Sequence, residues 1–237
     1  MPDSQAIAQT LPHDDVHNPA LLHHFATEEQ QRDASSLGMW IFLATEVMFF
    51  GGLFCAYLIY RRWYFGDFGA ASTSIDASLG AINTAVLICS SLTVVLAIWA
   101  AQTSRRGVML AMLALTMLFG LTFLGIKGIE YKQKFDEHHV PGPAFSFHDE
   151  IPGHPGVYAN PQHAQIFFAL YFIMTGLHAL HMVVGLGIFT WLFWMAWKGR
   201  FTPEYHTPLE IGGLYWHFVD IVWIYLFPLL YLIDRHK

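Results

Sequence analysis

The stretch that decides the fold is LGMWIFLATEVMFFGGLFCAYLIY, residues 37–60. It carries a single charged side chain, Glu46, among apolar, aromatic and small residues. A helix needs about 20 apolar residues to cross a hydrocarbon layer roughly 30 Å thick, so this stretch predicts a membrane-spanning helix. A lone carboxylate at such depth is costly, which makes Glu46 the first candidate for a special role.

The rest of the chain repeats this pattern. Hydrophobic residues make up 54% of the 237 residues and charged residues only 13%, about half the usual share in a soluble domain. Further apolar stretches cover 78–101, 107–128, 164–197 and 211–233. Lipid offers no partner for backbone polar groups, so these stretches must be helical. The sequence predicts an all-α membrane protein, a bundle of five transmembrane helices.

The remaining segments are polar. Residues 1–36 form a tail without the basic start and short apolar core of a secretory signal, and 37–237 is expected to be the transmembrane domain. A Gly/Ala/Ser stretch after the first span predicts a loop, and 129–163, rich in Pro, Gly and His, predicts a segment outside the bilayer. The net charge of −6 and the scattered basic residues do not suggest nucleic-acid binding.

Five Glu, Asp and His residues lie inside the predicted spans, and such residues usually face a bundle interior and pair with something. They are Glu46, His178, His181, His217 and Asp220. The same-face neighbours of Glu46 are apolar, so its partner must come from another helix. Glu46 and Asp220 lie nine residues after the starts of their spans, 37–60 and 211–233, which run parallel. One polar layer of Glu46, His217 and Asp220 is therefore expected.

Three functional interpretations compete for these residues. Imidazoles at helical spacing, such as His178 and His181, can bind a metal or haem. A proton or ion transporter could be built around Glu46 and Asp220, although such proteins favour broken helices or repeats. An accessory subunit would use the same groups to hold helices in register or to position lipid and partner. Plain interhelical hydrogen bonding is the structural alternative, and the histidine pair fits it best.

Five stretches together resemble subunit III of the haem–copper cytochrome oxidases, in its five-helix bacterial form. They are FLATEVMFF (42–50), INTAVLICSS (82–91), GIEY (128–131), TGLHALHMVVG (175–185) and YWHFVDIVW (215–223). The family's buried glutamate corresponds to Glu46, its paired histidines to His178 and His181, its Trp-His-Phe-Val-Asp to Trp216–Asp220, and its Glu-Tyr to Glu130-Tyr131. The resemblance covers about residues 37 to 233.

This resemblance implies an accessory subunit without haem or copper of its own. The redox cofactors would belong to subunit I, on which it docks in a complex that also contains subunit II. The family is thought to support proton uptake, to protect the oxidase from inactivation and to hold phospholipids in a cleft. Because this chain lacks the first two helices of the longest members, that cleft would need a wall from another subunit.

The resemblance also implies a location in the bacterial cytoplasmic (inner) membrane, with the N-terminus cytoplasmic and the C-terminus outside; counting basic residues does not decide the orientation. Four basic residues next to span ends would then lie on the cytoplasmic side, where they could hold anionic lipid head groups or simply set topology. They are Arg105, Arg106, Lys198 and Arg200. Cytochrome c oxidase is the favoured assignment, with quinol oxidase and nitric oxide reductase as alternatives.

Overall fold

The computed structural model describes residues 27–203 and 205–233, and this part of the chain is built from helices. In chain order they are α1 (Glu28–Trp63), α2 (Phe65–Thr73), α3 (Ala77–Gln102), α4 (Arg106–Asp136), α5 (Pro161–Trp197) and α6 (Thr207–Tyr231). The β-type pairing within these residues consists of one isolated bridge, between Glu150 and Tyr158.

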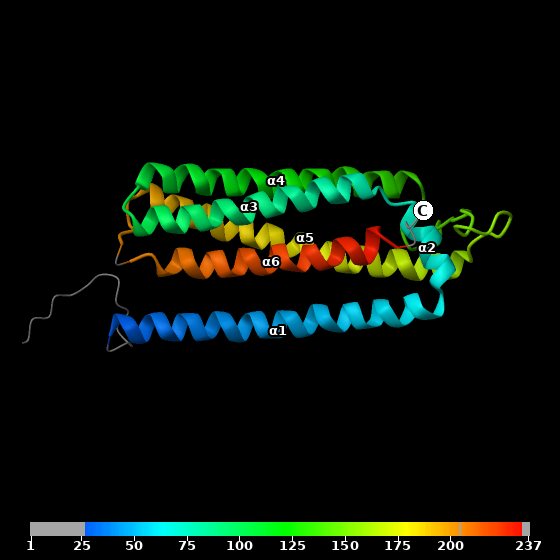
Figure 1. The fold of residues 1–237 in the computed structure, drawn as a ribbon, viewed down its shortest axis with the longest axis horizontal. Coiled ribbons are helices and arrows are strands. Elements are labelled where there is room, and N and C mark those ends of the chain that lie inside the picture. Colours follow the sequence, from blue (N-terminus) through cyan, green and yellow to red (C-terminus); the bar gives the residue numbers. More distant parts are fainter. Residues whose placement is uncertain (1–26, 204, 234–237) are drawn as a thin grey trace, which may run out of the picture.

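Five of the six helices, all except α2, are long and apolar enough to cross a membrane. They lie side by side along the long axis of the molecule, with α2 and the segment after α4 at one end and the α3–α4 turn at the other (Figure 1). The prediction of an all-α protein with five transmembrane helices is confirmed.

Two expected boundaries differ from the structure. The first helix begins at Glu28, inside the predicted polar tail, because the hydroxyl of Thr27 accepts a hydrogen bond from the Gln30 amide at 3.1 Å and caps it. Residues 1–26 of that tail lie outside the described residues. The Gly/Ala/Ser stretch expected as a loop contains helix α2 instead. Its small residues let it bury Phe68 and bring the Ser72 hydroxyl within 2.8 Å of the Leu230 carbonyl oxygen.

Helices α3 to α6 form the main packing unit, with α3 against α4 and α6, and α5 against α4 and α6. Trp216 is fully buried at its centre and donates its indole N–H to the Ser90 hydroxyl at 3.0 Å. A Cβ added to Gly120 or Gly185 would come within 2.9 Å of the Trp216 ring. These two positions therefore have to be glycine for the four helices to close around the indole.

Helix α1 is attached more loosely, through α6 and α5. Its buried apolar residues, Leu43, Phe50 and Tyr57, recur every seven positions and form one narrow stripe. At the C-terminal end of this stripe the Tyr57 hydroxyl donates to the Leu229 carbonyl oxygen at 2.6 Å. Most of the remaining α1 surface is exposed, and Gly51 and Gly52 have no atom within 4 Å of an added Cβ.

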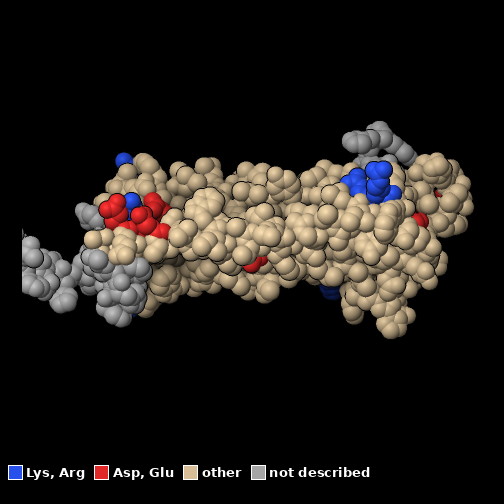
Figure 2. Space-filling model, turned by 90° about the horizontal axis from the view of Figure 1, so that it is seen from below, with Lys and Arg blue, Asp and Glu red and all other residues tan. Residues whose placement is uncertain are grey.

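The surface on the α1 side has a membrane-like distribution of charge. Charged side chains gather near the two ends of the molecule, and the long middle part is almost entirely uncharged (Figure 2). Arg61 and Arg62 lie in the last turn of α1, where cations offset the negative end of the helix dipole. This distribution fits a molecule whose middle lies in hydrocarbon.

Candidate functional site: buried polar clusters

The side chain of Glu46 pairs with His181 of α5. Glu46 Oε2 lies 3.1 Å from His181 Nε2, and the other ring nitrogen, Nδ1, lies 2.8 Å from the Leu177 carbonyl oxygen. A carbonyl oxygen only accepts, so Nδ1 must carry a proton. A second proton must then lie between Nε2 and the carboxylate. The pair is either imidazolium with carboxylate or neutral imidazole with carboxylic acid, and both forms share one proton.

Aromatic rings enclose this pair. The ring of Phe50 lies 5.4 Å from that of His181, and Phe42 stacks on Tyr215 at 6.1 Å. The Tyr215 hydroxyl donates to the backbone oxygen of His181 at 3.0 Å. Glu46 and His181 keep 20% and 16% of their side-chain surface, so the pair lies at the edge of the α1–α5 contact rather than in the core.

The expected layer of Glu46, His217 and Asp220 is wrong in its pairing. His217 Nδ1 lies 2.6 Å from the Ser91 hydroxyl, which is on α3. Asp220 is buried next to Ser91, and within the described residues neither of its carboxylate oxygens has a hydrogen bond of normal geometry. The argument from equal depth did not include helix rotation, which turns these two side chains toward Ser91 of α3.

His178 and His181 also take different directions, although they lie three residues apart. His178 is buried in the four-helix interior, between the rings of Phe123 and Trp223 at 5.3 and 5.2 Å. Neither of its ring nitrogens has a partner among the described residues. The two histidines therefore belong to separate environments and do not form a joint ligand set.

A third cluster lies near the C-terminal end of α4. Glu130 is fully buried and accepts hydrogen bonds from the hydroxyls of Tyr171 and Tyr231 at 2.6 and 2.5 Å. Its other oxygen lies 3.1 Å from the Lys127 ammonium, which also donates to Tyr231 and lies 4.7 Å above the Trp223 ring. The carboxylate and the ammonium thus find their partners in each other and in the two tyrosine hydroxyls.

Glu130 was expected from the family resemblance, but Lys127, Tyr171 and Tyr231 were not. The signal was present as the i, i+3 spacing of Lys127 and Glu130 at the end of a predicted span. The two tyrosines come from α5 and α6 and could not be assigned to this cluster before the helices were placed. Nearby, the Lys134 ammonium donates to the Ser74 carbonyl oxygen at 2.7 Å and ties α4 to the segment after α2.

His139 lies just outside the membrane-spanning helices, above this cluster. Its ring stacks on Phe168 at 5.0 Å, and Glu137 Oε2 lies 3.1 Å from its Nδ1. Burial lowers the pKa of His139 below its usual value, and the neighbouring Lys134 ammonium lowers it further, against the opposing effect of Glu137. Residues 137–160, which cap this end of the bundle, therefore favour neutral His139.

The four predicted lipid-binding residues lie around the opposite end of the bundle. The guanidinium of Arg106 donates to the Trp197 carbonyl oxygen, Arg105 lies 4.9 Å above the Trp99 ring, and Lys198 lies 3.8 Å above the Trp194 ring. Arg200 donates its backbone N–H to the Met195 oxygen at 3.1 Å. Cations held over tryptophans are typical of a membrane interface, and lipid binding by these residues stays a prediction.

Within the described residues, no group of three or more His, Cys, Asp or Glu side chains lies close enough together to hold a metal ion. Three of the ionisable groups instead connect helices: Glu46 with His181, His217 with Ser91, and Glu130 with Tyr171 and Tyr231. Fold and site define a multi-pass helical membrane protein in which several interior polar groups form contacts between helices.

Comparison with known proteins places the chain within this class. The family model described as "Cytochrome c oxidase subunit III" matches residues 9–138 and 161–234, so the chain belongs to the cytochrome c oxidase subunit III family. A probable cytochrome c oxidase subunit 3 from Nocardia farcinica is 31% identical, over 84% of this chain and 87% of its own length. The cytochrome c oxidase subunit 3 of Thermostichus vulcanus is 30% identical, over 86% and 89%.

A relative from another oxidase class is equally similar. A probable quinol oxidase subunit 3 from Staphylococcus haemolyticus is 32% identical, over 84% of this chain and 89% of its own length. The family therefore assigns the chain to subunit III of a haem–copper oxidase of the cytochrome c or quinol type.

Proposed function

We propose that the chain is an accessory subunit that contributes no redox centre and docks on the catalytic subunits I and II of a respiratory terminal oxidase, where it supports proton uptake and stability during turnover and binds lipid. The observation that carries this proposal is the family match over nearly all of the membrane-spanning helices. Haem and copper would then lie in the partner. In this role the chain's own polar groups hold a shape rather than carry out chemistry.

The exposed face of α1 supports docking. Trp40, Val47, Met48 and Trp63 are each more than half exposed, although they lie on a helix held by a single stripe. The Glu46–His181 pair sits beside this face and sets the rotation of α1 against α5. A fixed rotation presents one constant surface to the partner, which explains how a half-buried proton-sharing pair can serve assembly.

The orientation proposed is an N-terminus in the cytoplasm and a C-terminus outside, in the cytoplasmic (inner) membrane of a bacterium. Arg105 and Arg106 of the α3–α4 turn and Lys198 at the end of α5 would then lie on the cytoplasmic side.

Mild detergent extraction followed by mass spectrometry of co-purifying chains tests the proposal. A large haem–copper subunit should be recovered with this chain, while the separated chain should show neither metal nor visible absorbance. Recovery of the chain alone, as an oligomer that moves ions across liposomes, would favour the transporter and contradict the proposal. The electron donor that the purified complex oxidises, reduced cytochrome c or a quinol, distinguishes the two oxidase types, and cytochrome c is the expected one.

A further inference from the structure

A groove of about 590 Å³ lies between the start of α1 and the facing parts of α5 and α6. Pockets of this size bind small molecules or parts of larger ones. The cleft implied by the family resemblance was expected to need a wall from another subunit, whereas this groove is lined by this chain's own α1, α5, α6 and the segment before α6. None of the predicted lipid-binding residues lines it.

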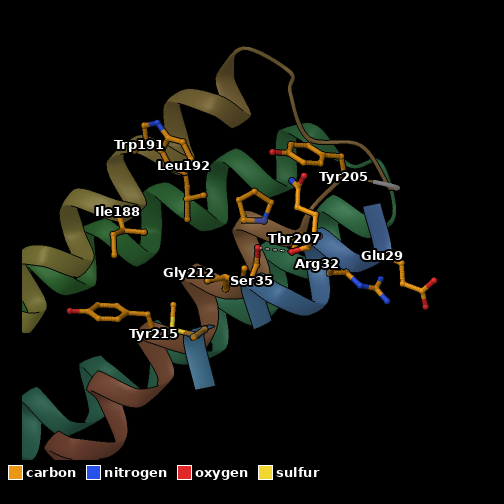
Figure 3. A pocket seen from close by; sticks show the side chains of 14 residues that line it. Glu29, Arg32, Ser35, Ile188, Trp191, Leu192, Tyr205, Thr207, Gly212 and Tyr215 are labelled. Atoms are coloured by element: carbon orange, nitrogen blue, oxygen red, sulfur yellow. Dashed lines mark hydrogen bonds between the residues drawn. The ribbon is translucent and has the colours of Figure 1, made fainter. Parts of the chain in front are cut away.

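The groove has a polar rim and an apolar floor. Glu29 and Arg32, in the first turns of α1, lie at its open end, while Ile188, Leu192 and Tyr215 line its interior (Figure 3). Arg32 and the deeper Met39 are seven residues apart on one helix, which places the floor about 10 Å below the rim. Such a change from charge to hydrocarbon over this distance matches the head and upper chain of an amphiphile.

The groove is accessible from the membrane as well as from the rim. Trp191 of α5, which lines it, keeps 52% of its surface exposed. The inner end is closed by Tyr215, which bonds to the backbone of His181 next to Glu46. A chain entering sideways would therefore fill the space between α1 and the bundle, where helix-to-helix contact is sparse, and would end beside the Glu46–His181 pair.

The rim selects the head group by charge. Arg32 is exposed and lines the opening, so a phosphate can reach its guanidinium. Glu29 lines the same opening and Asp33 is exposed next to it, and acidic side chains dominate this end of the surface (Figure 2). Repulsion by these carboxylates disfavours a purely anionic lipid, whereas an ammonium group would be attracted.

We propose that this groove binds one zwitterionic phospholipid of the phosphatidylethanolamine class, with its phosphate on Arg32, its ammonium group on Glu29 and one acyl chain against Ile188, Leu192 and Tyr215. The lipid acts as a wedge that holds α1 on the bundle. This inference deepens the lipid-binding role proposed above by naming its site and ligand.

Native mass spectrometry of the purified full-length chain tests it, after delipidation and addition of palmitoyl-oleoyl phosphatidylethanolamine or the matching phosphatidylglycerol. The unmodified chain should bind one phosphatidylethanolamine in preference to phosphatidylglycerol. Arg32→Gln should weaken that binding about tenfold, the loss expected for one charge-assisted contact. Ser35→Phe, which fills the groove between rim and floor, should abolish it.

Arg62→Gln is the matched control, because Arg62 is an exposed arginine at the other end of the same helix, and it should leave binding unchanged. Equal binding of both lipids, or binding insensitive to Arg32→Gln and Ser35→Phe, overturns the proposal. Co-purification with the oxidase is scored separately: a chain that assembles but binds no lipid here contradicts only this inference, and a chain that binds lipid without an oxidase partner contradicts only the proposed function.

Discussion

Helix α1 and the α3–α6 bundle are made of similar residues but are held together in different ways. In the most apolar stretch of α6, 56% of the residues are buried, against 17% in α1. The bundle is closed by Trp216 between Gly120 and Gly185 and by the Lys127–Glu130 cluster. Helix α1 relies on one stripe, one tyrosine hydrogen bond and the Glu46–His181 pair. Hydrophobicity alone therefore does not distinguish a core helix from an attached one.

The largest expected effect is in the bundle. Lys127→Met leaves the fully buried carboxylate of Glu130 without its cation, which typically costs about 3–5 kcal/mol of unfolding free energy. Denaturant unfolding in detergent, followed by helix content, measures this loss. The double variant Lys127→Met/Glu130→Gln should recover part of it. Lys132→Met, an exposed lysine on the same helix, should stay within about 0.5 kcal/mol.

Glycine substitutions compare the two regions directly. Gly185→Ala pushes a methyl group against the Trp216 ring and should cost about 1–3 kcal/mol, because the buried indole cannot move away. Gly52→Ala on α1 meets no atom within 4 Å and should be neutral or stabilise the helix by up to about 1 kcal/mol. The same unfolding measurement applies to both. Equal losses would show that α1 is packed as tightly as the bundle.

The proton-sharing pair tests how α1 is positioned. Glu46→Ala leaves Nε2 of His181 without its partner and should cost about 1–3 kcal/mol, seen as weaker association with the oxidase or a shorter active lifetime at nearly normal initial oxygen consumption. In Glu46→Gln the side-chain amide can donate to Nε2 of a neutral His181, so assembly should be normal. Initial turnover abolished in the Gln variant, with assembly intact, would show that proton exchange at this carboxylate is required.

A smaller effect is expected near the C-terminal end of α1. Tyr57→Phe keeps the buried ring but removes the hydrogen bond to Leu229, which should cost about 0.5–1.5 kcal/mol. Proteolysis of the link between α1 and α2 should quicken while the melting of the bundle changes little. Tyr225→Phe, at an exposed tyrosine of α6, is the control and should change neither.

The smallest expected effect concerns residues 137–160, which cap the end of the bundle next to α2. Because the pKa of His139 is lowered in the fold, the unfolded state binds more protons near and below its usual pKa of about 6.5. Stability of the cap should thus be complete above that pH and fall as the pH drops through it. Hydrogen exchange of residues 137–160 at pH 7.5 and 5.5 measures this. His139→Phe should reduce the pH dependence, whereas His154→Phe, at an exposed position, should preserve it.

Several features of the structure could not be predicted from the sequence, because they depend on how the helices are placed in three dimensions. The pairing of Glu46 with His181, rather than with His217 and Asp220, is a matter of helix rotation, and apolar stretches long enough to span say little about rotation. The Tyr171 and Tyr231 contacts to Glu130 join helices far apart in the chain. The start of α1 and the helix α2 were missed because a cap at Thr27 and burial of Phe68 override local composition.

The sequence by itself determined the environment and the class. Long uncharged stretches require helices in lipid, because the backbone has no other way to satisfy its polar groups, and five such stretches define the fold. Five sequence motifs that occur in the same order as in the family indicated the family. Single polar residues within apolar stretches indicated which positions need a hydrogen-bonding partner. Only the tertiary structure decided which partner each one has, because side chains meet across helices at angles set by packing of the whole bundle, as Trp216 between Gly120 and Gly185 illustrates.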